Sequence, residues 1–246
     1  PFSSVTTTAG STVLWRHSPA HSRVTIPAAI ARCRETGRWD AFKLRWKPGM
    51  PDQPHMYWDS DVAKVLEGIA NLLAVKRDGA LEAEADRLID DIVSAQEPSG
   101  YLNVYFTLVH PEERWSRLYD GHELYCAGHL IEAAVAYFEA TGKRKLLDAL
   151  CRYVDLIAAL FGRAPGQKRG YPGHPELELA LIRLYRITRD EKHLALARYF
   201  IEERGMSPAY FHTENPKVNL LNLQADRPLR EMKEATGHAV RAVYLY

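Results

Sequence analysis

Three histidines stand at equivalent places in this sequence: His122, His174 and His238 each follow a glycine. Each also precedes a stretch with the apolar spacing of a helix, which puts the histidine at a helix start. An imidazole can hydrogen-bond a hydroxyl group or transfer a proton near neutral pH. A single histidine of this kind would most simply be a helix cap or a satisfied buried ring. Three in equivalent positions indicate a functional cluster.

A fourth helix start offers carboxylates in place of a histidine. It reads Trp58-Asp59-Ser60-Asp61, and Asp59 is the residue type expected at a helix N-cap. If the four helix starts meet at one mouth, then Trp58, Asp59 and Asp61 line it together with the histidines. Polar groups placed around an apolar floor are typical of a site for a small molecule such as a sugar.

Other residues near these starts have two open readings. Glu123, Glu176 and Glu178 could serve as the carboxylates of glycoside chemistry. Glu123 and Glu176 could instead satisfy the amides of helix N-termini. His129 lies seven residues after His122 on roughly the same helix face, which favours packing or a supporting role. The three glycine-flanked histidines could also bind a metal, although their separation in sequence offers no ligand spacing to test.

The elements that must position these residues are helices in pairs. Apolar residues recur every three or four positions in each member of a pair, and a short polar turn joins the two. The stretch 122–142 is apolar nearly all round and predicts a buried helix, whereas 81–96 carries one charged face and predicts an outer helix. The predicted helices are 24–38, 59–77 and 81–96, 122–142 and 143–162, 174–190 and 191–205, and 237–246, after an irregular or β-like segment over 1–21.

Buried inner helices paired with solvated outer helices predict an all-α fold, an (α/α)6-type barrel built of helical hairpins. Hairpin repeats also suit an open helical array of the TPR or HEAT kind. A closed barrel of six hairpins needs more than ~300 residues. Since three hairpins and the start of a fourth are present, we expect residues 1–246 to be the N-terminal part of a single catalytic domain.

Composition excludes several other classes of protein. The 246 residues include 32 basic and 31 acidic side chains, a net charge of +1, so no basic excess favours nucleic acid as a partner. No apolar run suits a membrane span, and no P-loop or nucleophile elbow is present. Cys33, Cys126 and Cys151 form no CxxC pair. The start lacks both a signal peptide and a Met, so we expect an incomplete N-terminus and favour a cytoplasmic location; a homodimer stays open.

Several of these segments together resemble glycoside hydrolase family 127, the β-L-arabinofuranosidase family. The resemblance is carried by WDSDVAKVLEG at 58–68, HELYCAGHLIEAA from 122, GHPE from 173 and GHAVRA from 237, and it extends from about residue 13 to the end. It implies an (α/α)6 barrel followed by β-sandwich domains. On this basis the remainder of the barrel and the β-sandwiches are absent from the chain.

The resemblance also implies a chemistry and assigns roles within it. The family hydrolyses terminal β-L-arabinofuranosides with retention, using a cysteine nucleophile held on zinc and a glutamate acid/base. His122, His174 and His238 fall in motifs that contact the sugar, and Trp58, Asp59 and Asp61 line the same mouth. The catalytic glutamate and the zinc ligands lie downstream of GHAVRA in the family, beyond Tyr246. We therefore expect no catalytic residue and no metal ligand in this chain, which alone is inactive.

Two other functions stay open at this point. Another carbohydrate-active enzyme with an α/α barrel, such as a uronide hydrolase or an epimerase-like protein, would use carboxylates or histidines without zinc. A non-catalytic helical scaffold would bind protein partners and would tolerate alanine at all three histidines.

Overall fold

The computed structural model describes residues 24–246, and in this part of the chain the regular elements are all helical. The expected irregular segment over 1–21 lies outside the described residues. The α-helices are α2 (Ile26–Glu35), α3 (Trp58–Val75), α4 (Gly79–Ser94), α5 (Tyr105–Leu108), α6 (Glu123–Thr141), α7 (Lys145–Leu160), α8 (Leu177–Thr188), α9 (Glu191–Glu203), α10 (Phe211–Glu214) and α11 (Ala239–Leu245).

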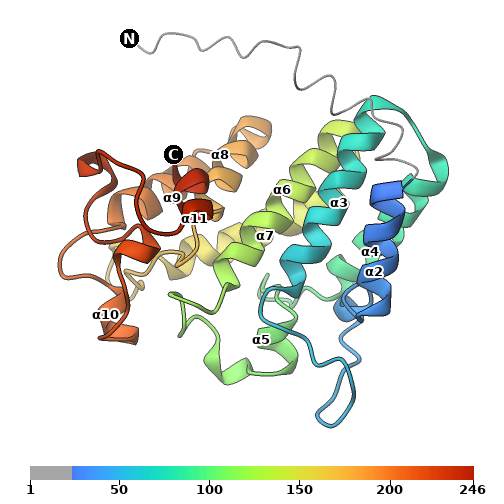
Figure 1. The fold of residues 1–246 in the computed structure, drawn as a ribbon. Helices are drawn as coiled ribbons and strands as arrows, with labels where there is room; N and C mark the ends of the chain where they lie inside the picture. The colour runs from blue at the N-terminus through green and yellow to red at the C-terminus, as the bar shows by residue number, and fades with distance from the viewer. Residues whose placement is uncertain (1–23) are drawn as a thin grey trace.

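The predicted hairpins are present as α3–α4, α6–α7 and α8–α9, and α11 begins a fourth. The inner helices pack in chain order, with α3 against α6, α6 against α8, and α8 against α11. The outer helices α4, α7 and α9 pack against one another in the same order. Figure 1 shows α3 and α6 side by side through the middle of the molecule. The all-α prediction is confirmed.

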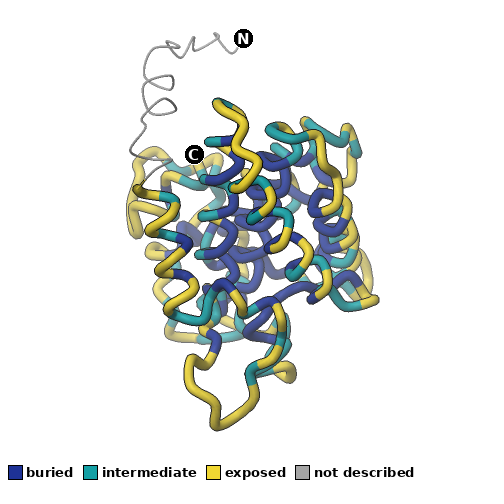
Figure 2. Tube along the Cα trace, turned by 90° about the vertical axis from the view of Figure 1, so that its right-hand side faces the viewer, coloured by how far each residue is buried: buried dark blue, intermediate teal, exposed yellow. Residues whose placement is uncertain are grey.

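Burial separates inner from outer helices as their apolar patterns predicted. Every residue of α6 from 123 to 137 is buried, since its small alanines and glycine let neighbouring helices approach on all sides. In α4 only one stripe is buried, made of Ala85, Leu88, Ile89 and Ile92. Figure 2 shows the buried segments gathered in the interior and the exposed ones around them. The assignment of 122–140 as inner and 81–96 as outer is confirmed.

Asp59 does not cap α3, and that prediction was wrong. The helix begins at Trp58, its N-cap position is held by Tyr57, and no side chain caps it. Asp59 lies inside the first turn, where its Oδ2 accepts a hydrogen bond of 3.0 Å from the backbone amide of Val104. Tertiary structure determines this bond, because a buried carboxylate needs a hydrogen-bond donor and the fold brings the Val104 amide to it. None of the helices in the described chain is long and apolar enough to cross a bilayer.

Candidate active site

His122, His174 and His238 come together, as their equivalent positions predicted. The ring centroids of His122 and His174 lie 6.1 Å apart, and those of His174 and His238 lie 5.8 Å apart. The three residues immediately precede or nearly precede α6, α8 and α11, so three hairpins that are distant in sequence each contribute one ring. What the cluster binds is a separate question, which depends on its polar atoms.

The loops that carry the first two histidines are joined through backbone. The amide of Gly173 donates to the carbonyl oxygen of Leu118 at 2.9 Å. A Cβ on Gly173 would stand only 2.4 Å from that oxygen, so no other residue could approach so closely. His122 itself has a φ of 58°, a strained conformation for a residue with a side chain. The glycine before His174 is therefore a condition for the cluster to form.

Each histidine directs one ring nitrogen to the backbone, which determines what the other can do. Nδ1 of His122 bonds the carbonyl of Asp120 at 2.5 Å, and Nδ1 of His174 bonds that of Pro175 at 2.9 Å. A carbonyl only accepts, so both Nδ1 atoms carry the proton and both Nε2 atoms are left as acceptors. In His238, Nδ1 accepts from the amide of Arg241 at 3.3 Å, so Nε2 is a donor in the neutral ring. Two acceptors and one donor match the hydroxyl groups of a sugar.

Burial favours the uncharged form of the first two imidazoles. Burial lowers the pKa of His122, and burial lowers that of His174 to about 4, with Arg241 and the neighbouring histidines adding to the effect. Neutral rings of this kind hydrogen-bond a ligand without holding a spare proton. The cluster is therefore suited to recognition more than to acid catalysis.

Tyrosines surround the cluster, and the sequence analysis did not identify them. The ring of Tyr125 lies 4.5 Å from that of His174, Tyr244 lies 5.8 Å from His174, and Tyr57 lies 6.1 Å from His122. Tyr125 stands three residues after His122, one helical turn further along α6. That spacing was the available signal, since residues three apart share a helix face.

The residues at the start of α3 bond elsewhere. Trp58 is buried beneath the guanidinium of Arg38, which lies 4.9 Å from its ring centroid. The carboxylate of Asp61 accepts a hydrogen bond of 2.9 Å from Nε of the same arginine, and the carboxylate of Asp59 accepts one from the backbone amide of Val104. Burial raises the pKa of Asp59 to about 7. A role for these three residues in binding sugar stays a prediction, and Tyr57 is the residue of this segment that reaches a histidine.

Two of the three candidate glutamates are occupied in holding the fold. Glu123 accepts from the Trp115 amide at 2.7 Å and from the hydroxyl of Tyr101. Glu178 accepts from the Glu176 amide at 3.1 Å and pairs with Arg204 at 2.9 Å. Both carboxylates are therefore bonded within the fold, and the partner amide of Glu123 belongs to a loop and not to a helix N-terminus. Glu176 is different, because one of its buried oxygens has no hydrogen-bond partner among the described residues.

Potential metal ligands gather at one place in the described residues, and that place does not include the clustered histidines. Ligand atoms of His110, Glu112 and Glu113 lie within 4.8 Å of one another on a partly exposed loop. The three clustered histidines do not form such a group, and neither do the cysteines, which lie apart on α2, α6 and α7. The residues described here do not build a zinc site that contains cysteine.

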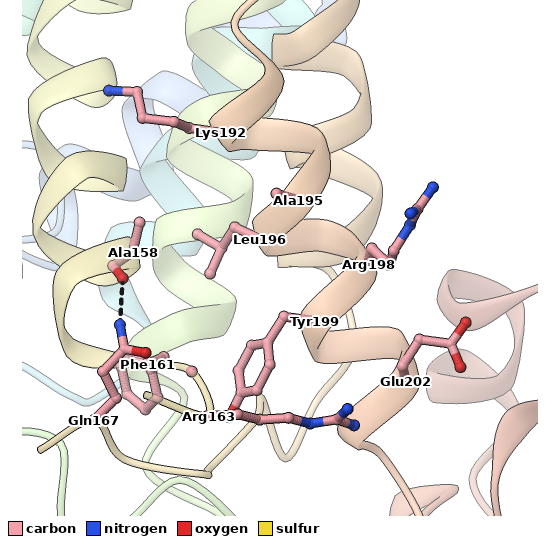
Figure 3. Close-up of a pocket in the computed structure, with 11 residues that line it drawn as sticks. Ala158, Phe161, Arg163, Gln167, Lys192, Ala195, Leu196, Arg198, Tyr199 and Glu202 are labelled. Carbon is pink, nitrogen blue, oxygen red and sulfur yellow. Dashed lines mark hydrogen bonds between the residues drawn. The ribbon is translucent and has the colours of Figure 1, made fainter. Parts of the chain in front are cut away.

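A groove on the outer wall has no part in the histidine site. It measures about 640 Å³ and lies between the end of α7 and the length of α9. Figure 3 shows Leu196 and Tyr199 turned into it and Arg198 turned away. Of its charged rim, Arg163 is paired with Glu203 at 2.8 Å. Its charges are largely neutralised within the fold.

Comparison with known proteins gives the family. Residues 6–246 match the family described as beta-L-arabinofuranosidase, GH127 catalytic domain. The chain belongs to glycoside hydrolase family 127. It is 37% identical over 206 residues to a non-reducing end beta-L-arabinofuranosidase of Bifidobacterium longum subsp. longum, an alignment that covers 77% of this chain and 31% of that protein.

Solved structures of family 127 share the fold. A GH127 beta-L-arabinofuranosidase from Geobacillus stearothermophilus T6 superposes with a TM-score of 0.90 and 43% identity, over 95% of this chain and 40% of that one. A second GH127 beta-arabinofuranosidase superposes with a TM-score of 0.82 and 37% identity, over 92% of this chain and 36% of that one. The family 127 assignment and the helical-barrel fold are thus confirmed, and the chain spans less than half the length of these relatives.

Proposed function

We propose that the complete protein hydrolyses terminal β-L-arabinofuranosides with retention, and that this chain supplies the wall that holds the sugar. His122, His174 and His238 would bind its hydroxyl groups, with Tyr125 and Tyr244 beside them. The observation that carries the proposal is the convergence of three imidazoles, from three hairpins, whose free nitrogens are two acceptors and one donor. The names of the family 127 relatives supply the sugar.

The bond-breaking groups are proposed to come from outside residues 1–246. In family 127, as the resemblance implies, they are a zinc-held cysteine and a glutamate acid/base, in a part of the barrel that is followed by β-sandwich domains. Zinc would hold that cysteine as its thiolate, the nucleophilic form. The cysteines described here do not fit this role, because burial raises the pKa of Cys33, Cys126 and Cys151 alike. We expect residues 1–246 alone to hydrolyse no arabinoside.

The test is hydrolysis of a chromogenic β-L-arabinofuranoside by the complete protein and by alanine variants of the three histidines. Each variant removes one hydrogen bond to the sugar, so we expect kcat/KM to fall about 10- to 100-fold, or about 1.5–3 kcal/mol. His212→Ala is the matched control, since His212 is exposed on α10. Activity that survives all three substitutions would identify a scaffold or a different sugar site.

Removal of metal separates the two enzymatic readings. A chelator should abolish turnover, and added zinc should restore it, if a zinc-held cysteine is the nucleophile. The sugar affinity of the histidines should stay within twofold, because none of them belongs to a group of metal ligands in the described chain. Turnover that resists chelation would favour a barrel enzyme that uses carboxylates or histidines without a metal.

A further inference from the structure

A buried acid and a buried imidazole meet beneath the histidine cluster. Glu176 ends the turn that carries His174 and is 1% exposed, while His129 on α6 is 3% exposed. Oε1 of Glu176 lies 3.3 Å from Nδ1 of His129. Oε2 of Glu176 and both ring nitrogens of His129 have no hydrogen-bond partner among the described residues. Such groups are costly to bury, so their presence calls for a reason.

The backbone of α6 is shaped to receive Glu176. A Cβ on Gly128 would stand 2.7 Å from Cγ of Glu176 and 2.9 Å from the amide nitrogen of Leu177. On the other side of the turn, Glu178 accepts from the amide of Glu176. The acid is thus held between α6 and the first turn of α8, two residues from His174. A displacement of its side chain would displace the turn.

Aromatic rings connect the buried pair to the cluster above it. The ring of Tyr125 lies 4.6 Å from that of His129 and 4.5 Å from that of His174. The ring of Tyr244 lies 5.9 Å from His129 and 5.8 Å from His174. Each tyrosine therefore contacts both His129, in the buried pair, and His174, in the cluster. In an interior packed this closely, a shift of one of these residues is transmitted to the other.

The surroundings of Glu176 favour its neutral form. Burial raises the pKa of Glu176 to about 8, and the nearby carboxylates add to the rise while Lys64 opposes it. Burial lowers the pKa of His129 to about 3. Both groups are therefore uncharged at pH 7. The titratable and charged groups around the pair are Lys64 and Glu67 on α3, Tyr125 and Glu132 on α6, Glu178 and Arg183 on α8, and Tyr244 on α11.

We propose that Glu176 is a positioning residue for His174: lodged against Gly128 and His129 as a neutral carboxylic acid, it holds the turn in the sugar-binding arrangement. Loss of its proton to solvent would leave a buried carboxylate without a cation bonded to it, since Arg183 is paired with Glu67 and Glu132 and Lys64 donates to the hydroxyl of Tyr125. The turn would then move, and His174 with it. The part of this inference that concerns sugar rests on the proposed function.

The first test follows the His174 ring by NMR in the complete protein labelled with carbon-13 histidine, from pH 6 to 9.5. In the parent we expect its resonance to shift with a midpoint near pH 8, well above the pKa of the imidazole itself. Glu176→Gln keeps the size and hydrogen-bonding edge of the neutral acid but cannot ionise, so the shift should vanish. Glu139→Gln, at an exposed position of α6, should leave it unchanged. Persistence of the shift in Glu176→Gln would overturn the inference.

The second test measures KM and kcat for the arabinoside over the same range. The neutral fraction of Glu176 falls about tenfold for each pH unit above its pKa. KM of the parent should therefore rise about tenfold between pH 7 and 9 with kcat nearly constant, whereas Glu176→Gln should show a flat KM. A rise in KM that persists in the variant would contradict the inference. If the parent hydrolyses no arabinoside but the NMR shift is present and lost in Glu176→Gln, the proposed function fails and the positioning of His174 stands.

A second variant covers the case in which Glu176→Gln does not fold. His129→Gln replaces the imidazole beside the acid, so the midpoint of the His174 shift should move by half a pH unit or more. An unmoved midpoint would show that the acid beside His129 is not the group that titrates, and the inference would fall.

Discussion

The two ends of the helical hairpins are built differently. At one end, short turns join the helices of each pair, over 76–78, 142–144 and 189–190. At the other end, long connections over 95–122, 161–176 and 204–238 lead into the next inner helix. The histidines all stand where these long connections end. Long ordered loops on a rigid scaffold are where binding residues concentrate.

At the short-turn end, local side-chain caps begin two of the three outer helices, α4 and α9. Asp78 caps α4, where its carboxylate accepts from two backbone amides, and Asp190 caps α9, where its carboxylate accepts from the amide of Lys192. At the long-loop end the bonds join residues distant in sequence, as from Gly173 to Leu118. The difference teaches that tertiary contacts of the short turns are exposed ion pairs, such as Lys143 with Asp86, whereas the long-loop end depends on buried bonds between residues distant in sequence. Substitutions at the two ends should therefore change the free energy of unfolding by different amounts.

The largest effect is expected for Arg204→Ala, at the long-loop end. This arginine is fully buried and donates to the carbonyls of Pro172 and Leu223 and to the carboxylate of Glu178. Its loss leaves that carboxylate buried without its cation, so we expect the free energy of unfolding to fall by about 3–5 kcal/mol. Urea denaturation measures the change.

Arg230→Ala is the matched control for this experiment. Arg230 pairs with Glu202 through an exposed side chain, and exposed pairs contribute only about 0–1 kcal/mol. Similar losses for the two variants would mean that the long-loop end does not depend on its buried contacts.

The sequence predicted the features that depend on local patterns and missed those that depend on contacts between distant residues. The helix pairs and the buried nature of α6 were evident because apolar spacing is a local property. The histidine cluster was evident because three repeats place the same residue at the same point. The hydrogen-bond partner of Asp59 could not be predicted, because Val104 lies 45 residues further along the chain. The contact of Glu176 with His129 depends on the register between α8 and α6, which no local pattern encodes.

A smaller effect, dependent on pH, is expected for Asp59→Asn. The folded-state pKa of Asp59 is raised to about 7, against about 3.9 in an unfolded chain. The stability that this group contributes is therefore present below about pH 4 and is lost as the pH rises through 7. Asparagine keeps an oxygen for the Val104 amide but cannot ionise. Between pH 5 and 8 the variant should lose about 1–3 kcal/mol less of its free energy of unfolding than the parent does.

Urea denaturation of both proteins at pH 5, 6.5 and 8 checks this difference. Glu123 and Glu176 also have raised pKa values, of about 7 and about 8, but they are present in both proteins and cancel in the comparison. Parallel pH profiles would contradict the raised pKa of Asp59 in the folded protein.

The smallest effect is expected at the short-turn end, for Asp78→Ala. The carboxylate of Asp78 accepts from the amides of Ala80 and Leu81 at 3.1 Å each, in the first turn of α4. Alanine leaves both amides to water, which costs about 1 kcal/mol for a cap of this kind. Because α4 is an outer helix, the loss should reach neither the histidines nor KM for the arabinoside. Thermal unfolding and the pH 7 kinetics measure the two quantities separately, and a rise in KM above twofold would show that the two ends of the hairpin are coupled.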